Sequence, residues 1–385
     1  MKKICVVTGT RAEYGLLKPV IEKIAADKDL KLSVVATGMH LCPEFGLTYN
    51  EIEQDGIVID EKIEILLSSD TSLGMTKSTG LAVISFAEYF ERKRPDMLVV
   101  LGDRFEIFAC AVAAAMAQIP IAHLFGGDTT EGAIDEFIRH SITKMSYLHF
   151  TSTEQYKQRV EQLGEHPDRV FNVGSVGVEN ILSLPLLSLK ELEERIGFCI
   201  GGDYALVTFH PVTLEPGEAE AQFEQLLNAI SQFRDMKFIF TKANSDTSGR
   251  AINKMIDDYT ARNAICVAFE SLGVRRYLSV MKYAKMVIGN SSSGLYEAPS
   301  FKIPTINIGD RQRGRIQAAS VINCGSAADE IIKAISIGLV KDCSDTVNPY
   351  QGINPSQTIV DKIKDFLFEE KIDLKKKFWD IEVLL

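Results

Sequence analysis

The chain has 385 residues, of which 46% are hydrophobic and 24% charged, and its formal net charge at pH 7 is −10. This composition excludes a disordered or fibrous protein, and the length favours two domains, because one hydrophobic core seldom grows beyond about 250–300 residues. The negative charge disfavours a nucleic-acid partner and favours a small anionic ligand, although a local basic cleft could still bind a phosphate.

The N-terminus reads MKKICVVTGT, and its apolar run is too short for the core of a signal peptide, so we interpret it as a first strand. No stretch approaches the ~20 apolar residues of a membrane helix. We therefore expect a cytoplasmic protein without a membrane partner. The seven cysteines include no C-x-x-C pair, which favours buried reduced thiols over disulfides or a zinc site.

Short apolar runs alternate with helix-like segments along the whole chain, which is typical of buried parallel strands in βαβ units. The pattern predicts a doubly wound α/β fold. The expected strands are KICVVTGT, LSVVATG, DMLVVLGD, IPIAHLF, YLHFTST and VFNVGS in the first half, and ALVTFHP, FIFTKA, AICVAF, MVIGNS and TINIGD in the second.

A polar stretch separates the two sets of strands and carries Pro185 and the Gly201-Gly202 pair as breakers. Each half then forms a Rossmann-like unit, and two such units facing each other would bury a ligand in a cleft outside the carboxyl ends of their strands. The last helical segment, NPSQTIVDKIKDFLFEE, could pack back across the first domain. The expected boundaries are 1–176 for the N-terminal domain, 177–365 for the C-terminal domain and 366–385 for a tail on the first domain.

Two motifs follow strands of the first half. TGTRAEYG, residues 8–15, is not G-x-G-x-x-G, which argues against the dinucleotide site of a dehydrogenase. Its glycine turn and Arg11 at a helix N-terminus could hold a phosphate, or could form an ordinary turn with a surface arginine. LGDRFE places Asp103 at the carboxyl end of a strand, where it could enter the cleft or cap a helix.

The segment HLFGGDTTEGAIDEFIRH, residues 123–140, concentrates ionisable groups directly after a strand. Gly126-Gly127 allows a sharp turn, and a helix is expected to begin near Ala133. Asp135 and Arg139 are four apart, so they share one helix face and can pair. The number of acids favours a functional role over a capped, salt-bridged helix start. The ionisable residues are Asp128, Glu131, Asp135, Glu136, His123, Arg139 and His140.

Three motifs stand out in the second half. In TFHP, Pro211 favours an extended chain at His210 and its exposure at a strand tip, although a lone histidine is more often structural. VIGNSSSGLYEAPSF runs from a strand into serines and then a helix bearing Glu297, an arrangement that can bind a phosphate or simply cap the helix. NIGDRQRGR adds Arg311, Arg313 and Arg315, and together these motifs predict a diphosphate site.

Taken together, TGTRAEYG, LGDRFE, the GGD…DEFIRHSITKMS segment, TFHP, GNSSSGLYE and NIGDRQRGR resemble the UDP-N-acetylglucosamine 2-epimerases, specifically the hydrolysing branch of sialic acid synthesis. The resemblance covers nearly the whole chain and implies a glycosyltransferase B type fold, with two Rossmann-like domains facing a cleft. It implies that UDP-GlcNAc and water give ManNAc and UDP, by anti elimination to 2-acetamidoglucal and hydration with inversion at C2. It also implies a homodimer or tetramer and no cofactor.

The resemblance implies site residues position by position. Glu297 would contact the ribose, His40 and Glu13 would lie on the sugar side, and the serine loop would hold the diphosphate. The catalytic candidates are Asp103, Glu131, Asp135 and His210, and the substrate-binding candidates are Arg11, Glu13, His40, Arg139, Asn244, Ser291, Ser292, Ser293, Gly294, Glu297 and Arg311, with no metal ligand.

Phe125 departs from the family pattern, because many relatives carry a glutamate there and phenylalanine transfers no proton. We nominate Asp103 as the base and Asp135 or Glu131 for hydration. Four alternatives remain: a sugar transferase, a non-hydrolysing epimerase, a hydrolysing enzyme for a UDP-2,4-diacetamido sugar of legionaminic acid synthesis, and a nucleotide-sugar sensor without turnover.

Overall fold

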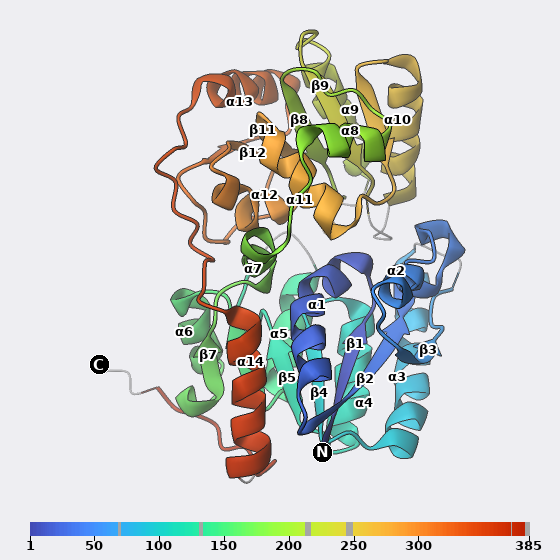
Figure 1. The fold of residues 1–385 in the computed structure, drawn as a ribbon, viewed down its shortest axis with the longest axis vertical. Coiled ribbons are helices and arrows are strands. Elements are labelled where there is room, and N and C mark those ends of the chain that lie inside the picture. The colour runs from blue at the N-terminus through green and yellow to red at the C-terminus, as the bar shows by residue number, and fades with distance from the viewer. Residues whose placement is uncertain (68–70, 131–133, 212–216, 244–248, 371, 382–385) are drawn as a thin grey trace. The chain divides into compact units, whose positions relative to one another are not determined.

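The computed structural model describes residues 1–67, 71–130, 134–211, 217–243, 249–370 and 372–381. The chain divides into two compact units, each an α/β assembly with its own sheet (Figure 1). Unit 1 comprises Met1–Asp128, Asp135–Asn180 and Tyr350–Leu385, and unit 2 comprises Thr129–Ile134 and Ile181–Pro349.

Unit 1 is built on a seven-stranded parallel sheet in the order β3-β2-β1-β4-β5-β6-β7. Strand β1 lies between β2 and β4, so that Val6 pairs with Val34 on one side and Val99 on the other. The strands are β1 (Lys2–Thr8), β2 (Leu30–Thr37), β3 (Ile59–Ile63), β4 (Met97–Leu101), β5 (Ile121–Leu124), β6 (Leu148–Thr151) and β7 (Val170–Asn172).

Helices cover this sheet, and their apolar faces complete its core. The helices are α1 (Arg11–Ala26), α2 (Tyr49–Gln54), α3 (Ser72–Lys93), α4 (Phe105–Met116), α5 (Asp135–Met145), α6 (Glu154–Gln162), α7 (Val176–Ser183) and α14 (Pro355–Lys364). Short helical turns are η1 (Gly38–Leu41), η2 (Pro43–Phe45), η3 (Pro167–Arg169) and η5 (Asp365–Glu369).

The end of the chain returns to unit 1. Ile359, Val360 and Ile363 of α14 are buried in the same core cluster as Leu17 and Val20 of α1. The described part of the tail follows them, and Trp379 N–H donates to the Gly164 carbonyl at 3.0 Å. The sequence boundary placed residues 350–365 in the second domain, whereas they belong to unit 1 and three of their apolar side chains are buried in its core.

Unit 2 has a six-stranded parallel sheet in the order β10-β9-β8-β11-β12-β13, with one apolar cluster on each face. Its strands are β8 (Tyr204–Thr208), β9 (Lys237–Thr241), β10 (Cys266–Phe269), β11 (Met286–Gly289), β12 (Thr305–Ile308) and β13 (Val321–Cys324). Its helices are α8 (Leu189–Ile196), α9 (Ala219–Ile230), α10 (Gly249–Arg262), α11 (Gly273–Tyr283), α12 (Ser293–Tyr296), η4 (Ala298–Phe301) and α13 (Ala328–Val340).

Both sheets follow the Rossmann order 3-2-1-4-5-6, and unit 1 adds one more strand at its edge. The prediction of an α/β protein with two Rossmann-like domains is therefore confirmed, while a ligand cleft between them stays a prediction. In each sheet the strand order reverses between two central strands, β1 and β4 in unit 1 and β8 and β11 in unit 2. Ligands of such sheets bind beside the turns that follow these strands.

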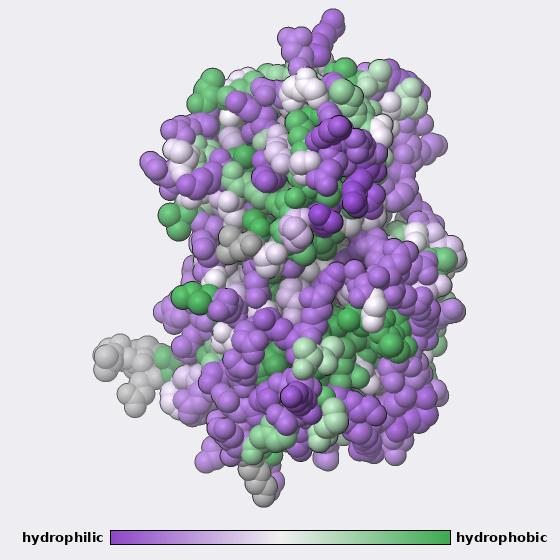
Figure 2. All heavy atoms as spheres, viewed as in Figure 1, coloured by the Kyte–Doolittle hydropathy of each residue, from purple (hydrophilic) through white to green (hydrophobic). Residues whose placement is uncertain are grey.

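The surface in Figure 2 is mixed, with hydrophilic side chains interspersed with smaller groups of hydrophobic ones. Among the described helices, none combines the length and the apolar character that a membrane crossing requires. All seven cysteines are unpaired; Cys199 is exposed, whereas Cys5, Cys110, Cys266 and Cys343 are buried.

Candidate active site

The first turn of unit 1 joins β1 to α1 through a capping box. Thr10 is the N-cap, and its hydroxyl accepts from Glu13 N–H at 3.2 Å. In return, Oε2 of Glu13 accepts from the N–H groups of Thr10 at 3.2 Å and Gly9 at 2.7 Å. Burial, followed by the nearby Glu106 carboxylate, raises the pKa of Glu13 to about 8. Glu13 is thus a buried capping group, and Arg11 follows the cap at the first helical position.

His40 lies in η1, directly after β2, and is fully buried. Its Nε2 lies 3.0 Å from the Thr8 hydroxyl and its Nδ1 lies 2.8 Å from the Thr48 hydroxyl. Burial lowers the pKa of His40 to about 4, so the ring is neutral at pH 7. The two hydroxyl groups therefore fix the ring beneath the first turn, and its approach to a sugar stays a prediction.

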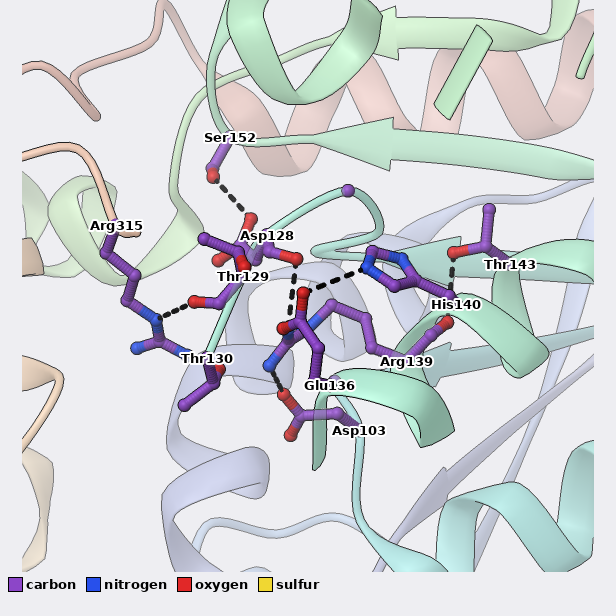
Figure 3. A network of polar contacts seen from close by, with 12 residues as sticks. Asp103, Asp128, Thr129, Thr130, Glu136, Arg139, His140, Thr143, Ser152 and Arg315 are labelled. Atoms are coloured by element: carbon purple, nitrogen blue, oxygen red, sulfur yellow. Dashed lines mark hydrogen bonds and ion pairs between the residues drawn. The ribbon is translucent and has the colours of Figure 1, made fainter. Parts of the chain in front are cut away.

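An ion pair between Asp103 and Arg139 connects the turn after β4 with helix α5. Arg139 is 1% exposed; it also pairs with Glu136 at 3.1 Å and donates to the Asp128 carbonyl at 3.0 Å (Figure 3). The Asp103 side chain is 21% exposed. The N-cap residue of α4 is Arg104, which follows Asp103. Asp103 is thus a carboxylate of fixed orientation that solvent can still reach.

The turn after β5 has an unusual backbone. Phe125 has a φ of +66°, a conformation that costs a non-glycine residue about 1–2 kcal/mol, and its N–H donates to the Phe150 carbonyl at 2.8 Å. Gly127 has a φ of +80°, and a Cβ there would lie 2.3 Å from the Tyr156 carbonyl oxygen. The chain therefore requires glycine at 127, as the sharp turn predicted from Gly126-Gly127 implies.

The acids of this segment have separate positions. Asp128 is 3% exposed and accepts from the Ser152 hydroxyl at 3.2 Å (Figure 3). Asp135 begins helix α5, one turn before Arg139, and Glu136 also lies 3.2 Å from His140 Nε2. Glu131 lies outside the described residues, as does Ala133, where the helix was expected to begin.

In unit 2, His210 follows β8 and is tied to the turn after β11. Its N–H donates to the side-chain carbonyl of Asn290 at 2.7 Å, and its own carbonyl accepts from the Asn290 amide at 2.8 Å. The predicted exposure of His210 is wrong, because this double hydrogen bond holds it against the neighbouring strand and leaves it only 8% exposed. Asn290 was not predicted as a site residue, although it stands in the motif VIGNSSSGLYEAPSF.

The serine loop precedes the four-residue helix α12. Ser292 is its N-cap, and the hydroxyl groups of Ser291 and Ser293 lie 3.1 Å apart. The Tyr277 hydroxyl hydrogen-bonds to Ser293. Gly294 is required for packing, since a Cβ there would lie 2.7 Å from Thr305 Cγ2. The loop thus presents a cluster of half-buried hydroxyl groups at the carboxyl end of β11.

Glu297 follows α12 and is half-buried, and its Oε2 atom is buried. Its Oε2 has no hydrogen-bond partner within the described part of the chain, and burial raises the pKa of Glu297 to about 8. Its carboxyl group is therefore mostly protonated at neutral pH. Such a group can donate as well as accept a hydrogen bond.

The three arginines after β12 have different surroundings. Arg311 donates to the Asn290 carbonyl at 3.2 Å, and the buried Gln312 donates to the same oxygen at 2.7 Å. Arg315 donates to the Thr129 carbonyl at 2.9 Å and to the Thr130 hydroxyl at 3.0 Å (Figure 3). Arg313 is exposed, and its NH1 lies 4.0 Å from Asp310. The structure thus brings Arg311 to the serine loop and His210 turn, with Asn290 between them.

Asn244, predicted to bind substrate, lies outside the described residues. Within the described ranges, no group of three or more histidine, cysteine, aspartate or glutamate side chains is arranged to hold a metal ion. The candidate groups are therefore carboxylates and an arginine in unit 1, and hydroxyl groups, a histidine and arginines in unit 2.

Comparisons with known proteins decide the family. The family model described as UDP-N-acetylglucosamine 2-epimerase matches residues 22–364. The chain belongs to this family. One relative is the GDP/UDP-N,N'-diacetylbacillosamine 2-epimerase (hydrolyzing) of Campylobacter jejuni. It is 46% identical over 323 residues, which cover 84% of this chain and 84% of that protein. The polysialic acid biosynthesis protein P7 of Escherichia coli is 42% identical over 390 residues, covering 99% of this chain and 98% of that protein.

A solved structure of a 2-epimerase supports the fold. The UDP-GlcNAc 2-epimerase from Neisseria meningitidis, solved with UDP-GlcNAc bound, superposes with a TM-score of 0.77. It covers 94% of this chain and 99% of that one, at 20% sequence identity. At this identity the likeness establishes the fold that the chain shares with the 2-epimerase family.

Proposed function

We propose that the protein is a hydrolysing 2-epimerase that converts UDP-GlcNAc and water into ManNAc and UDP, for use in sialic acid synthesis. Membership of the 2-epimerase family supports the substrate class. The Campylobacter relative of 46% identity, which is named as hydrolysing, supports the hydrolysing outcome, and the Escherichia coli relative of 42% identity, which is named for polysialic acid biosynthesis, supports the pathway. The observation that carries the proposal is the Asp103–Arg139 pair, which holds a partly exposed carboxylate at the carboxyl edge of the sheet in unit 1.

The first half-reaction needs departure of UDP and removal of a proton. The C2 hydrogen is not adjacent to a carbonyl, so it becomes acidic only as the C1–O bond to UDP lengthens and positive charge develops at C1. Asp103 then takes the proton, and the C2–H electron pair forms the C1=C2 bond of 2-acetamidoglucal. General base catalysis of this kind contributes ~10²–10⁴-fold. Arg139 fixes the carboxylate for this step.

The departing diphosphate gains negative charge, and the groups of unit 2 are suited to stabilise it. Arg311, His210 and the hydroxyl groups of the serine loop are donors of the kind that stabilise developing charge in active sites. Glu297 would accept from and donate to the ribose hydroxyl groups, because its protonated carboxyl group has both capacities. No step of this scheme requires a metal ion.

The second half-reaction adds water to the glycal. The oxygen of water bonds to C1, and a carboxyl group delivers a proton to C2 on the face that gives the manno configuration. Phe125 carries no transferable proton, so Asp135 or Glu131 is assigned to this step. The products are ManNAc and UDP, and the elements of one water molecule balance the reaction.

A UDP-2,4-diacetamido sugar is the second candidate substrate. The Campylobacter relative is named for such a sugar and has 46% identity, although it covers less of the chain than the Escherichia coli relative does. The two substrates differ at C4 and C6, away from the atoms that react. A homodimer or tetramer, and a cytoplasmic location, stay part of the proposal.

The test is turnover of each nucleotide sugar by the protein alone in deuterated, oxygen-18-labelled water, followed by NMR and mass spectrometry. We expect a free 2-acetamido sugar with deuterium at C2 and heavy oxygen at C1, together with UDP. An intact epimerised nucleotide sugar would instead indicate the non-hydrolysing reaction. Release of UDP only with an added acceptor would indicate a transferase, and binding without turnover a sensor.

Variants test the assignment of the base. Asp103→Asn should lower UDP release and glycal formation together by ~10²–10⁴-fold. Asp135→Asn should let the glycal accumulate. Asp96→Asn is the matched control, because Asp96 lies at the opposite end of β4 and pairs with Lys2 at 3.1 Å. Full activity of the Asp103 variant would refute the assignment.

A further inference from the structure

Two buried glutamates press against the same glycine beneath the first turn of unit 1. Oε2 of Glu13 lies 2.7 Å from the N–H of Gly9. A Cβ at Gly9 would lie 2.5 Å from Cγ and 2.8 Å from Oε1 of Glu106. Glu13 comes from α1 and Glu106 from α4, the helices that follow β1 and β4. Both side chains therefore lie where the strand order reverses.

Each glutamate has one oxygen with partners and one without. Oε2 of Glu13 accepts two backbone N–H groups, and Oε1 of Glu106 accepts from Nε of Arg104 at 2.8 Å. Oε1 of Glu13 and Oε2 of Glu106 are buried and have no hydrogen-bond partner among the described residues. Buried polar atoms nearly always have a partner, because an unpaired one costs its full desolvation. Each carboxyl group thus has one oxygen without a partner, while its other oxygen lies close to the same glycine, and this arrangement indicates a missing donor.

The charges around the two glutamates also indicate that a proton is bound there. The groups that face Glu13 are the carboxylates of Glu106 and Asp103 and the guanidinium group of Arg104. Asp103 has its own partner in Arg139, and His40, which lies under the same turn, is neutral. Arg104 can therefore neutralise only one of the two buried carboxylates. A single proton would remove the excess charge and supply the missing donor.

We propose that one proton is shared between Glu13 and Glu106, with Oε1 of Glu13 donating to Oε2 of Glu106. We assign both a positioning role, which for Glu13 replaces the sugar contact that the resemblance implies. Their bond joins the turn that carries Arg11 to the turn that carries Asp103, and this part of the inference rests on the proposed function. Loss of the proton places two like charges against Gly9 and pushes these turns apart, so turnover falls on the alkaline side.

Infrared spectroscopy of the unliganded protein tests the shared proton without reference to activity. At pH 7 the wild-type protein should show the carbonyl band of a protonated carboxyl group that shifts in D₂O and disappears as the pH rises past about 8. Glu13→Gln and Glu106→Gln should each remove the same band. Glu297→Gln is the control, because it should remove only the separate band of the protonated carboxyl group of Glu297 in unit 2. A spectrum that neither variant changes would overturn the proposal.

The pH profile of UDP release tests the positioning role. The wild-type kcat should fall above pH about 8. In Glu106→Gln the amide keeps an acceptor for Arg104 and supplies a permanent donor to Glu13. No second charge can then form, so the alkaline fall of kcat near pH 8 should disappear, with kcat at neutral pH retained. Glu106→Leu should have a lower kcat at every pH. It should still unfold cooperatively in urea, which shows that the variant is folded.

Glu22→Gln is the control variant, at a half-exposed position on α1. It should leave the alkaline fall of kcat at the same pH as in the wild type. If kcat of Glu106→Gln falls at the same pH as kcat of the wild type, the positioning role is refuted. If no nucleotide sugar is turned over by any form of the protein, the proposed function fails, while the infrared bands still decide whether the proton is shared.

Discussion

Glu297 shows how burial alone changes what a side chain can do. It lies directly after α12 beside the serine loop, and Arg315 is the cation that partly offsets the burial of its carboxyl group. Burial nevertheless raises the pKa of Glu297 to about 8. A group that is ionised in the unfolded chain is therefore protonated in the native protein at neutral pH, and folding must take up a proton there.

This proton uptake predicts a pH-dependent stability difference for Glu297→Gln. Between pH 4.5 and about 8 the native state binds one more proton at this site than the unfolded state, so wild-type stability falls by ~1.4 kcal/mol per pH unit as the pH rises. Glutamine has no such dependence. The variant should thus gain on the wild type with rising pH, by roughly 3 kcal/mol at pH 7.

Urea unfolding of both proteins at several pH values between about 5 and 8 measures this difference. Glu224→Gln, an exposed position on α9 in the same unit, should show a constant difference from the wild type. Parallel curves for Glu297→Gln and the wild type would contradict the prediction.

For single residues, the sequence locates side chains that directly follow strands. It does not locate those that hydrogen-bond to backbone groups far away in the sequence. Asp103 and Glu297 are visible because they stand beside glycine turns at the ends of apolar runs. Asn290 and Gln312 were missed because their partners are set by tertiary structure; Asn290 bonds the backbone of a residue 80 positions away. Glu106 was missed because an acid in the first turn of a helix is usually a capping group.

The strands, too, divide into those that can be predicted from a local apolar run and those that cannot. The eleven strands expected from apolar runs are present, whereas β3 and β13 were not predicted. Both lie at the edge of their sheet, where a strand has one neighbour and keeps polar side chains. β3 reads IDEKI and has a single fully buried residue, so it gives no continuous apolar run. The criterion of buried parallel strands therefore finds the centre of each sheet and one of its edges, β7 or β10, and misses the other edge strand.

Gly289, the last residue of β11, provides a prediction for an element boundary. It has a φ of +133°, and a Cβ there would lie 1.9 Å from the Thr208 carbonyl oxygen on β8. Gly289→Ala must separate these two central strands of unit 2. We expect a loss of about 3 kcal/mol or more, combining backbone strain with overpacking.

Gly309→Ala is the matched comparison for this prediction. Gly309 has a φ of +68°, but a Cβ there would meet no atom within 4 Å. Its substitution should therefore cost only the strain of about 1–2 kcal/mol. The free energy of unfolding of both variants, from urea titration, gives the comparison. Equal losses would show that the close approach of β8 and β11 at Gly289 has no energetic consequence.

At the scale of the whole molecule, unit 1 is assembled from separate parts of the chain. Its main body ends at Asn180, and its last segment begins at Tyr350 after all of the second sheet has been traversed. The two parts meet closely, since Ser175 N–H donates to the Tyr350 carbonyl at 2.8 Å and the Tyr156 and Tyr350 hydroxyl groups lie 3.2 Å apart. An apolar helix near a chain end does not by itself reveal which unit it completes.

The returning segment predicts that residues 1–180 alone do not form a stable unit. Ile359, Val360, Ile363 and Phe366 are buried in the core of unit 1, and burying four such side chains contributes ~6–12 kcal/mol. That is comparable to the whole stability of a domain, which is about 5–15 kcal/mol. Joining 1–180 to 350–385 with a short flexible linker should restore cooperative urea unfolding, because residues 175 and 350 are already hydrogen-bonded neighbours. A point variant of the joined chain tests the buried helix directly, because Ile363→Ala should lower the free energy of unfolding by about 2–5 kcal/mol. Ile353→Ala is the control; this position is 88% exposed, so the substitution should cost almost nothing. Cooperative unfolding of 1–180 alone, at the midpoint of the joined chain, would show that the returning segment is not part of the core of unit 1.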